Sequence, residues 1–317
     1  MTKNTTRAGR LSAAVLALTA FAGVTGCGSG GTAVKSAAPR SNTSHALSPD
    51  PAQATVTQQI SRIETTHHTR IGAYAIDTGT GRVVSHRPDE SFAFASTFKA
   101  MACGAVLRKA RRTDPGLLDK VIHYTKDDLV EYSPVTEKHV DTGMTVAALC
   151  HAAITESDNT AGNLVLRQIG GPAGLTAFFR SLGDRVSRSD RWETALNDWK
   201  PGEKRDTTAP RPWAKDLRAL TVGDALAPAD RRRLIGWMKA TVTGDKRIRA
   251  GLPKSWTVGD KTGTGGTYGT ANDIAIAWPP SGPPLIIVIT TNRPAAHDEA
   301  DDQAVAQTAR ILSQALR

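Results

Sequence analysis

A serine and a lysine stand three residues apart, Ser96 and Lys99, at the start of a stretch with helical periodicity. Residues three apart share one face of a helix, so the Lys99 amine can lie beside the Ser96 hydroxyl. A serine at a helix N-terminus also feels the positive end of the helix dipole, which favours an ionised nucleophile. The pair therefore predicts nucleophilic catalysis. A chain of this length should hold roughly one such match by chance, so an N-cap serine beside a surface lysine is the alternative.

Two more polar motifs follow in the chain. Ser-Asp-Asn at 157–159 opens another predicted helix, and Lys-Thr-Gly-Thr-Gly at 261–265 closes a predicted strand. The glycines let the backbone approach a ligand closely, while Lys261 and Thr262 offer a cation and a hydroxyl to a carboxylate. Taken singly, the first motif is also a good helix cap and the second an ordinary exit from a strand.

The elements that must position these residues can be predicted from periodicity. Strand patterns occupy 70–77, 82–86, 256–262, 273–278 and 285–291, and the last is continuously apolar, as in a central strand covered on both faces. Helical patterns occupy 52–67, 228–242 and 298–316, and apolar helical stretches recur at 97–107, 145–155, 159–169 and 173–182. This order predicts an α/β fold: a five-stranded sheet flanked by helices, made from 52–88 and 210–317, with an all-helical insertion at 89–209.

The three motifs in this order resemble the set found in class A β-lactamases and penicillin-binding proteins. The separations, 61 residues from Ser96 to Ser157 and 104 from Ser157 to Lys261, are also similar to those of class A. The resemblance covers about residues 55–317, and it implies a β-lactamase domain over 52–317 with an antiparallel sheet.

A fourth segment distinguishes class A β-lactamases from penicillin-binding proteins. Residues 190–197 resemble the start of the class A ω-loop (here residues 190–206), which implies that Glu193 and Asn197 hold and activate the hydrolytic water. Arg191 and Asp206 would close this loop as an ion pair. A penicillin-binding peptidase lacks such a base, so the loop favours a β-lactamase. Thr194 stands where the family often has a proline after a cis peptide bond, which leaves the geometry of that bond open.

The resemblance also implies a role for each site residue. Ser96 would attack the β-lactam carbonyl, with the N–H groups of Ser96 and Thr264 stabilising the oxyanion. Ser157 would pass a proton to the departing nitrogen, and the base for acylation is Lys99 or Glu193. The residues expected to bind the substrate are Tyr132, Asn159, Lys261, Thr262, Gly263 and Arg247.

Two departures from the family bear on substrates. Ala271 stands where many class A enzymes carry a carboxylate-binding arginine, and Arg247 resembles the arginine that replaces it in actinobacterial enzymes. Ala95 and Gly265 stand where some carbapenem-hydrolysing enzymes have a cysteine pair. We therefore expect hydrolysis of penicillins, and of cephalosporins, as the activity.

The three cysteines have separate interpretations. Lys3, Arg7 and Arg10 precede a run of about 14 apolar residues, too short to span a bilayer as a helix, which predicts a signal peptide over 1–27. Val-Thr-Gly-Cys at 24–27 resembles a lipobox, so Cys27 would carry a lipid, and the Gly/Ser/Pro-rich segment 28–51 would be a flexible tether to the membrane. The resemblance implies a disulfide between Cys103 and Cys150.

Charge and composition exclude several other classes. The chain has 317 residues and a net charge of +10, of which residues 1–50 carry +4. Its basic residues lack the clustering and interleaved aromatics of a nucleic-acid binder, and its eight histidines form no metal-ligand spacing. We expect an exported monomer without metal or cofactor; a DD-peptidase-like acyltransferase or a non-catalytic envelope lipoprotein is the alternative.

Overall fold

The computed structural model describes residues 51–317. The predicted signal peptide, the lipidation of Cys27 and nearly all of the tether lie outside the described residues. Within residues 51–317, no helix is long and apolar enough to cross a membrane.

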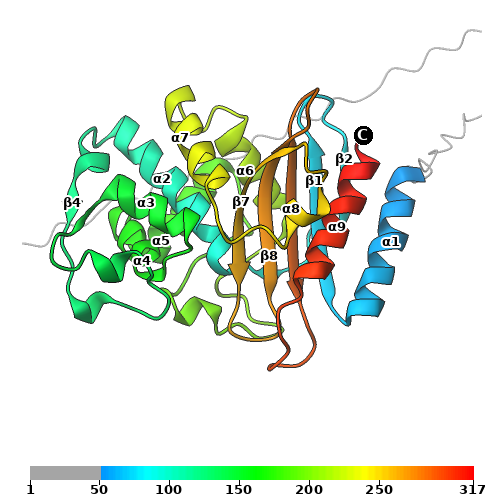
Figure 1. Ribbon diagram of the computed structural model, residues 1–317, viewed down its shortest axis with the longest axis horizontal. Helices are drawn as coiled ribbons and strands as arrows, with labels where there is room; N and C mark the ends of the chain where they lie inside the picture. Colours follow the sequence, from blue (N-terminus) through cyan, green and yellow to red (C-terminus); the bar gives the residue numbers. More distant parts are fainter. Residues whose placement is uncertain (1–50) are drawn as a thin grey trace, which may run out of the picture. The chain divides into compact units, whose positions relative to one another are not determined.

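A five-stranded antiparallel sheet forms the centre of the fold, as predicted (Figure 1). Its order is β2-β1-β9-β8-β7, and every neighbouring pair is antiparallel. The strands are β1 (Arg70–Asp77), β2 (Val83–His86), β7 (Thr257–Thr264), β8 (Ala271–Trp278) and β9 (Leu285–Asn292). Every residue of β9 is buried, because this apolar strand has neighbours on both edges and helices over both faces.

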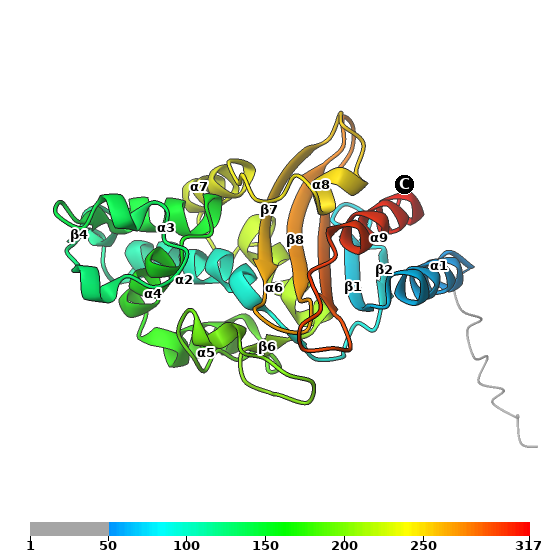
Figure 2. The ribbon, with the colours of Figure 1, turned by 60° about the horizontal axis from the view of Figure 1, so that its bottom comes forward.

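One face of the sheet is covered by α1 (Pro51–His67) and α9 (Asp302–Ala315), with the short α8 (Ile248–Gly251) beside them (Figures 1 and 2). Ile60 of α1 and Leu312 of α9 meet Ile287 of β9 in one buried cluster. The sequence prediction was right for both long helices, although α9 begins four residues later than expected, after its N-cap Asp301 accepts a hydrogen bond from the Ala304 amide.

The opposite face is covered by α6 (Pro210–Thr221), which was not predicted as a helix. The prolines at 210 and 212 made this segment resemble a loop. A proline is nevertheless tolerated in the first turn of a helix, because the N–H there has no partner within the helix. Trp213, Leu217 and Leu220 show the buried spacing of an amphipathic helix. The indole of Trp213 stacks on Phe94, with ring centroids 5.7 Å apart.

The remaining helices lie on this side of the sheet (Figure 2). They are α2 (Phe98–Arg112), α3 (Val146–Thr155), α4 (Asn159–Gln168), α5 (Gly171–Leu182) and α7 (Pro228–Lys239), close to the predicted stretches.

Two pairs of two-residue strands were too short to show alternation: β3 (Phe92–Ala93) with β6 (Thr207–Thr208), and β4 (Val121–Ile122) with β5 (Met144–Thr145). The division into an α/β part and a helical part stays a prediction, since one apolar cluster runs from α2 to β8 and β9.

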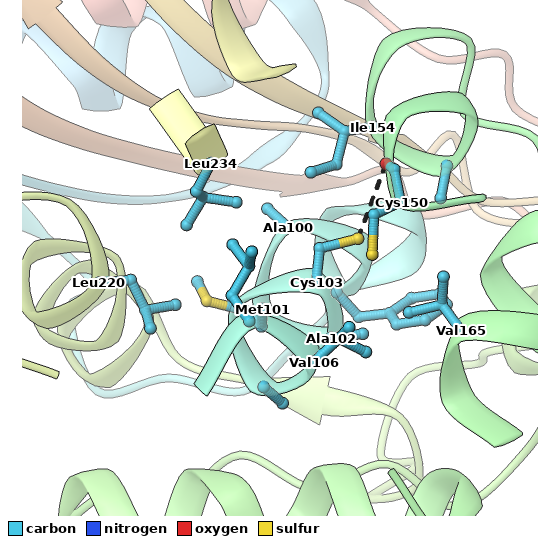
Figure 3. Packing of buried hydrophobic residues seen from close by; sticks show 14 of the residues in the cluster. Ala100, Met101, Ala102, Cys103, Val106, Cys150, Ile154, Val165, Leu220 and Leu234 are labelled. Atoms are coloured by element: carbon cyan, nitrogen blue, oxygen red, sulfur yellow. Dashed lines mark hydrogen bonds between the residues drawn. The ribbon is translucent and has the colours of Figure 1, made fainter. Parts of the chain in front are cut away.

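The predicted disulfide between Cys103 and Cys150 was wrong for this structure. Both are free, fully buried cysteines in the described part of the chain. The Cys103 thiol instead donates to the Cys150 carbonyl oxygen, with Sγ and O 3.7 Å apart (Figure 3). Cysteine packs as a small apolar side chain, and here the two residues fill the interface of α2 and α3. Burial raises the pKa of the Cys103 thiol well above its usual value, so the thiol stays protonated.

Candidate active site

A cavity of about 540 Å³ opens where β7 meets the helices. It brings together most of the residues that the sequence singled out, from segments far apart in the chain. Its lining consists of Ser96, Glu131, Tyr132, Ser157, Asn159, Thr194, Asn197, Asp198, Thr243, Arg247, Thr262, Thr264, Gly265 and Gly266. Lys99, Glu193 and Lys261 lie directly behind this lining and are buried.

Ser96 and Lys99 adopt the arrangement expected from their spacing. Ser96 lies in a short 3-10 helix, η1 (Ala95–Thr97), that runs into α2, and Lys99 belongs to the first turn of α2. The Lys99 Nζ donates to the Ser96 Oγ at 2.9 Å. The lysine is fully buried, and this burial lowers its pKa while the neighbouring Glu193 carboxylate opposes the shift. A lysine of lowered pKa beside a serine hydroxyl can accept its proton.

Three further groups surround the Lys99 ammonium. Its Nζ donates to the Ser157 carbonyl oxygen at 2.7 Å and to Asn159 Oδ1 at 2.6 Å, and it lies 3.0 Å from Glu193 Oε1. These contacts fix the amine in position.

Glu193 contacts both members of the Ser96–Lys99 pair. The Ser96 Oγ donates to Glu193 Oε1 at 3.1 Å, and Asn197 Nδ2 donates to Glu193 Oε2 at 2.7 Å. The peptide bond between Glu193 and Thr194, left open by the sequence, is cis. Oε1 of the carboxylate therefore faces the nucleophile, while Asn197 holds Oε2.

The two ends of the ω-loop that carries Glu193 are joined by an ion pair and hydrogen bonds. Arg191 Nε lies 2.6 Å from Asp206 Oδ2, and Asp206 Oδ1 accepts from the backbone amides of Asp190 and Arg191. Asp206 is fully buried, so these hydrogen bonds compensate the loss of hydration of its charge. These contacts hold the two ends of the ω-loop together.

Ser157 and Lys261 form the second wall of the site. Ser157 has a left-handed backbone (φ 59°), and the Lys261 Nζ donates to its hydroxyl at 3.0 Å. Lys261 is fully buried on β7; burial, then repulsion from Lys99, lowers its pKa to about 7. A hydroxyl that accepts a hydrogen bond from a buried lysine is well placed to pass a proton.

A cationic end of the cavity lies along the last residues of β7. The Arg247 guanidinium is buried and donates to Thr264 Oγ1 at 2.7 Å and to the Gly263 carbonyl oxygen at 2.8 Å. Its Nε pairs with Asp302 Oδ1 at 2.6 Å. A Cβ at Gly263 would lie 2.9 Å from the Phe94 carbonyl oxygen, so glycine allows β7 to approach η1. Together with Thr262, these groups can bind an anion.

Tyr132 and Asn159 stand at the opposite side of the mouth. The Tyr132 side chain is 57% exposed, on a left-handed backbone (φ 59°) whose carbonyl oxygen accepts from the Asn159 amide. Asn159 Nδ2 donates to the Glu131 carbonyl oxygen at 2.9 Å. The tyrosine ring can therefore contact a ligand at the entrance.

Two functional neighbours were missed by the sequence reasoning. Asn163 holds the Glu193 backbone, and the Thr243 hydroxyl lies 2.6 Å from that of Thr262. Asp158, which the sequence offered as a helix cap, does cap α4 and also accepts from the amides of Val135 and Thr136. Asn163 follows Asn159 by four residues on α4, so helical spacing places both on one face and was the available signal. Thr243 precedes Arg247 in an irregular segment that gave no pattern.

The whole arrangement suits acyl transfer to water. A serine nucleophile has two bases within hydrogen-bond reach, a second serine is poised for proton relay, and a cationic end can hold a substrate carboxylate. Within residues 51–317, no group of three or more His, Cys, Asp or Glu side chains is arranged to hold a metal ion.

Comparisons with known proteins agree with this chemistry. Residues 55–316 match the β-lactamase enzyme family. β-Lactamase FAR-1 of Nocardia farcinica is 53% identical over 261 residues, which cover 82% of this chain and 83% of the relative. The carbapenem-hydrolysing β-lactamase KPC of Klebsiella oxytoca is 46% identical over 261 residues, covering 82% of this chain and 89% of that relative.

Solved structures give the same result. A β-lactamase from Streptosporangium roseum has a TM-score of 0.82 and 59% identity, covering 83% of this chain and 98% of its own. An ancestral class A β-lactamase has a TM-score of 0.79 and 51% identity, covering 82% of this chain and 99% of its own. The chain therefore belongs to the class A β-lactamase family.

Proposed function

We propose that this β-lactam hydrolase opens penicillins and cephalosporins through an acyl-enzyme on Ser96. The observation that carries the proposal is the position of the Ser96 hydroxyl, 2.9 Å from Lys99 Nζ and 3.1 Å from Glu193 Oε1. Both groups lie within hydrogen-bond reach of the nucleophile, and either can take its proton and later return it.

In the acylation step, Ser96 Oγ bonds to the lactam carbonyl carbon and its proton passes to Lys99 or Glu193, both of which reach the hydroxyl directly. The N–H groups of Ser96 and Thr264 stabilise the oxyanion. The lactam C–N bond then breaks, and the nitrogen takes a proton from Ser157, which Lys261 or Lys99 resupplies. A proton held by Glu193 returns to Lys99 across their 3.0 Å contact, so the carboxylate is free for the next step.

In the deacylation step, a water molecule attacks the ester carbon while Glu193 takes its proton. The Asn197 amide orients the carboxylate through its contact with Oε2. The ester C–O bond breaks, Ser96 regains its proton, and the ring-opened acid leaves. Glu193 is what separates a hydrolase from a peptidase-like protein that stays acylated.

Substrate binding is assigned to the rest of the cavity. Lys261, Thr262 and Arg247 would bind the substrate carboxylate by charge-assisted hydrogen bonds. Asn159 and the Gly263–Thr264 backbone would hold the acylamino side chain, and Tyr132 would cover it at the mouth.

Two substitutions test these roles in the purified domain. Ser96→Ala should abolish nitrocefin hydrolysis, and Glu193→Ala should accumulate a covalent adduct with benzylpenicillin, seen by intact-protein mass spectrometry. Glu137→Ala removes an exposed acid outside the cavity and should turn over normally. Full turnover by the Glu193 variant would refute the role given to that carboxylate.

We also propose export and lipid attachment, supported by the pattern of basic residues, apolar run and Cys27 at the N-terminus. Radiolabelled palmitate should be incorporated into the full chain in a bacterial host and not into Cys27→Ser. We further propose a monomer, which light scattering of the purified domain would test.

A further inference from the structure

The turn between β7 and β8 contacts the ω-loop behind the cavity. The Thr267 hydroxyl in this turn donates to the Trp199 carbonyl oxygen in the loop at 2.5 Å. The next residue, Tyr268, meets the Trp199 indole edge to face, with ring centroids 6.0 Å apart and planes at 81°. Trp199 is only 4% exposed. One polar contact and one aromatic contact therefore join the same pair of segments.

Both sides of this contact are anchored independently. Tyr268 donates its amide to the Ala296 carbonyl oxygen and accepts from the Arg293 amide, which fixes the turn to the segment after β9. Trp199 Nε1 donates to the Glu203 carbonyl oxygen within the ω-loop at 3.3 Å. The ω-loop is thus held against a turn that is itself hydrogen-bonded to the segment after β9.

The contact lies directly behind two segments that line the cavity. Asn197 and Asp198 precede Trp199, and Gly265 and Gly266 precede Thr267; all four line the cavity. A displacement of Trp199 therefore moves Asn197, whose amide holds Glu193 Oε2 at 2.7 Å.

We propose that Thr267, Tyr268 and Trp199 form a clasp that positions Asn197 and Glu193 for the attack of water on the acyl-enzyme. The proposal rests on the deacylation role given to Glu193 above. The three are positioning residues, since none of them needs to touch the substrate.

The clasp should affect deacylation much more than acylation. Ser96 and Lys99 belong to η1 and α2, and Lys99 is held by the Ser157 carbonyl oxygen and Asn159, which are not part of the ω-loop. Lys99 also contacts Glu193 Oε1 at 3.0 Å, but its two contacts outside the ω-loop keep this base in place for acylation when the loop shifts. Attack of water depends on the Glu193 carboxylate alone, and a misplacement of about 1 Å can cost on the order of 100-fold in rate.

The test separates the two steps kinetically. Thr267→Val removes the hydroxyl and keeps the shape of the side chain, and stopped-flow and quench-flow measurements with benzylpenicillin give acylation and deacylation rate constants. We expect deacylation to fall at least tenfold, acylation to stay within twofold, and Thr267→Ser to restore both. Tyr268→Leu, which removes the ring contact alone, should slow deacylation in the same direction.

A matched control is Thr65→Val on α1, where the threonine hydroxyl also donates to a backbone carbonyl, that of Ser61, at 3.0 Å. It should leave both rate constants unchanged. Rate constants measured on the acylated population do not depend on the folded fraction, so partial unfolding of a variant cannot imitate the effect.

The outcomes are distinguishable. Equal loss of both rate constants in Thr267→Val, no loss in either, or failure of Thr267→Ser to restore deacylation would overturn the clasp. If Glu193→Ala accumulates acyl-enzyme and Thr267→Val does not, the clasp alone fails. If neither accumulates it, the deacylation role of Glu193 fails as well.

Discussion

Asn163 holds Glu193 by both of its backbone hydrogen-bonding groups. Its Oδ1 accepts from the Glu193 amide and its Nδ2 donates to the Glu193 carbonyl oxygen, each at 2.9 Å. Both residues are buried. One side chain on α4 thus satisfies the backbone N–H and C=O of Glu193, as a neighbouring strand would in a sheet. It also fixes the position of the Glu193 carboxylate relative to α4.

The first prediction concerns this residue. Asn163→Ala leaves a buried N–H and C=O without partners, which should cost about 2–3 kcal/mol of unfolding free energy. For a domain of this size the melting temperature should fall by about 4–10 °C, and acyl-enzyme should accumulate because Glu193 is no longer held. Differential scanning calorimetry and mass spectrometry measure the two effects. Gln168→Ala, at the far end of the same helix, should show neither.

The second prediction concerns the pH dependence of substrate capture. Burial lowers the pKa of Lys261 to about 7, so the free enzyme loses this positive charge as the pH rises through that value. A substrate carboxylate binds the charged form, so kcat/KM for benzylpenicillin should decline above about pH 7.

The matching variant is Lys261→Arg. Arginine stays charged throughout this range, so kcat/KM of this variant should decline only at higher pH. At neutral pH its kcat/KM should be lower than that of the wild type. An unchanged alkaline decline in this variant would assign the titration to another group, such as Lys99.

Local patterns were sufficient for the five strands of the main sheet, for most of the helices and for pairs of residues on one element. The adjacency of Ser96 and Lys99 follows from helical spacing, and the buried β9 follows from its apolar run. The contact of Ser96 with Glu193 joins residues 97 apart in the chain, and no local pattern predicts it. That relationship came from the resemblance to a family, because the ω-loop has little regular structure of its own.

Where a local pattern or the family resemblance failed, two physical solutions suited the same residues. Pro210 and Pro212 indicate a loop, but they also suit the first turn of α6. Two cysteines on facing helices suit a disulfide, and they equally suit a packed core in which the Cys103 thiol donates to a carbonyl oxygen. Tertiary packing decided both cases.

The third prediction concerns the buried arginine. Arg247 is fixed by Asp302 and by the Gly263 carbonyl oxygen, with one nitrogen on Thr264 Oγ1. Arg247→Ala should raise KM for benzylpenicillin by about 10–100-fold, since a charge-assisted hydrogen bond contributes about 1.5–3 kcal/mol. The methyl ester of the same penicillin lacks the carboxylate, so its kcat/KM should change far less. Equal losses for acid and ester would indicate a structural role instead.

The fourth prediction concerns a buried pair of acids far from the cavity. Asp216 on α6 and Asp184 after α5 are both buried, and each has one carboxyl oxygen without a hydrogen-bond partner among residues 51–317. Burial, and then the neighbouring Asp184, raises the pKa of Asp216 to about 9, while Arg180 opposes the shift. A proton shared between the two carboxyl groups would satisfy both oxygens, as in other close carboxyl pairs.

The sign of the effect on stability follows from this raised pKa. An unfolded chain releases the Asp proton near pH 4, whereas the folded protein keeps it up to about pH 9. The contribution of Asp216 to unfolding free energy is therefore greatest below pH 4 and is lost progressively as the pH rises toward 9. Asp216→Asn supplies an amide that donates to Asp184 and does not titrate. Its urea midpoint should exceed that of the wild type increasingly from pH 5 to pH 9, whereas Asp89→Asn, an exposed acid paired with Arg211, should bring no such gain. A parallel pH profile for wild type and Asp216→Asn would show that the two acids do not share a proton.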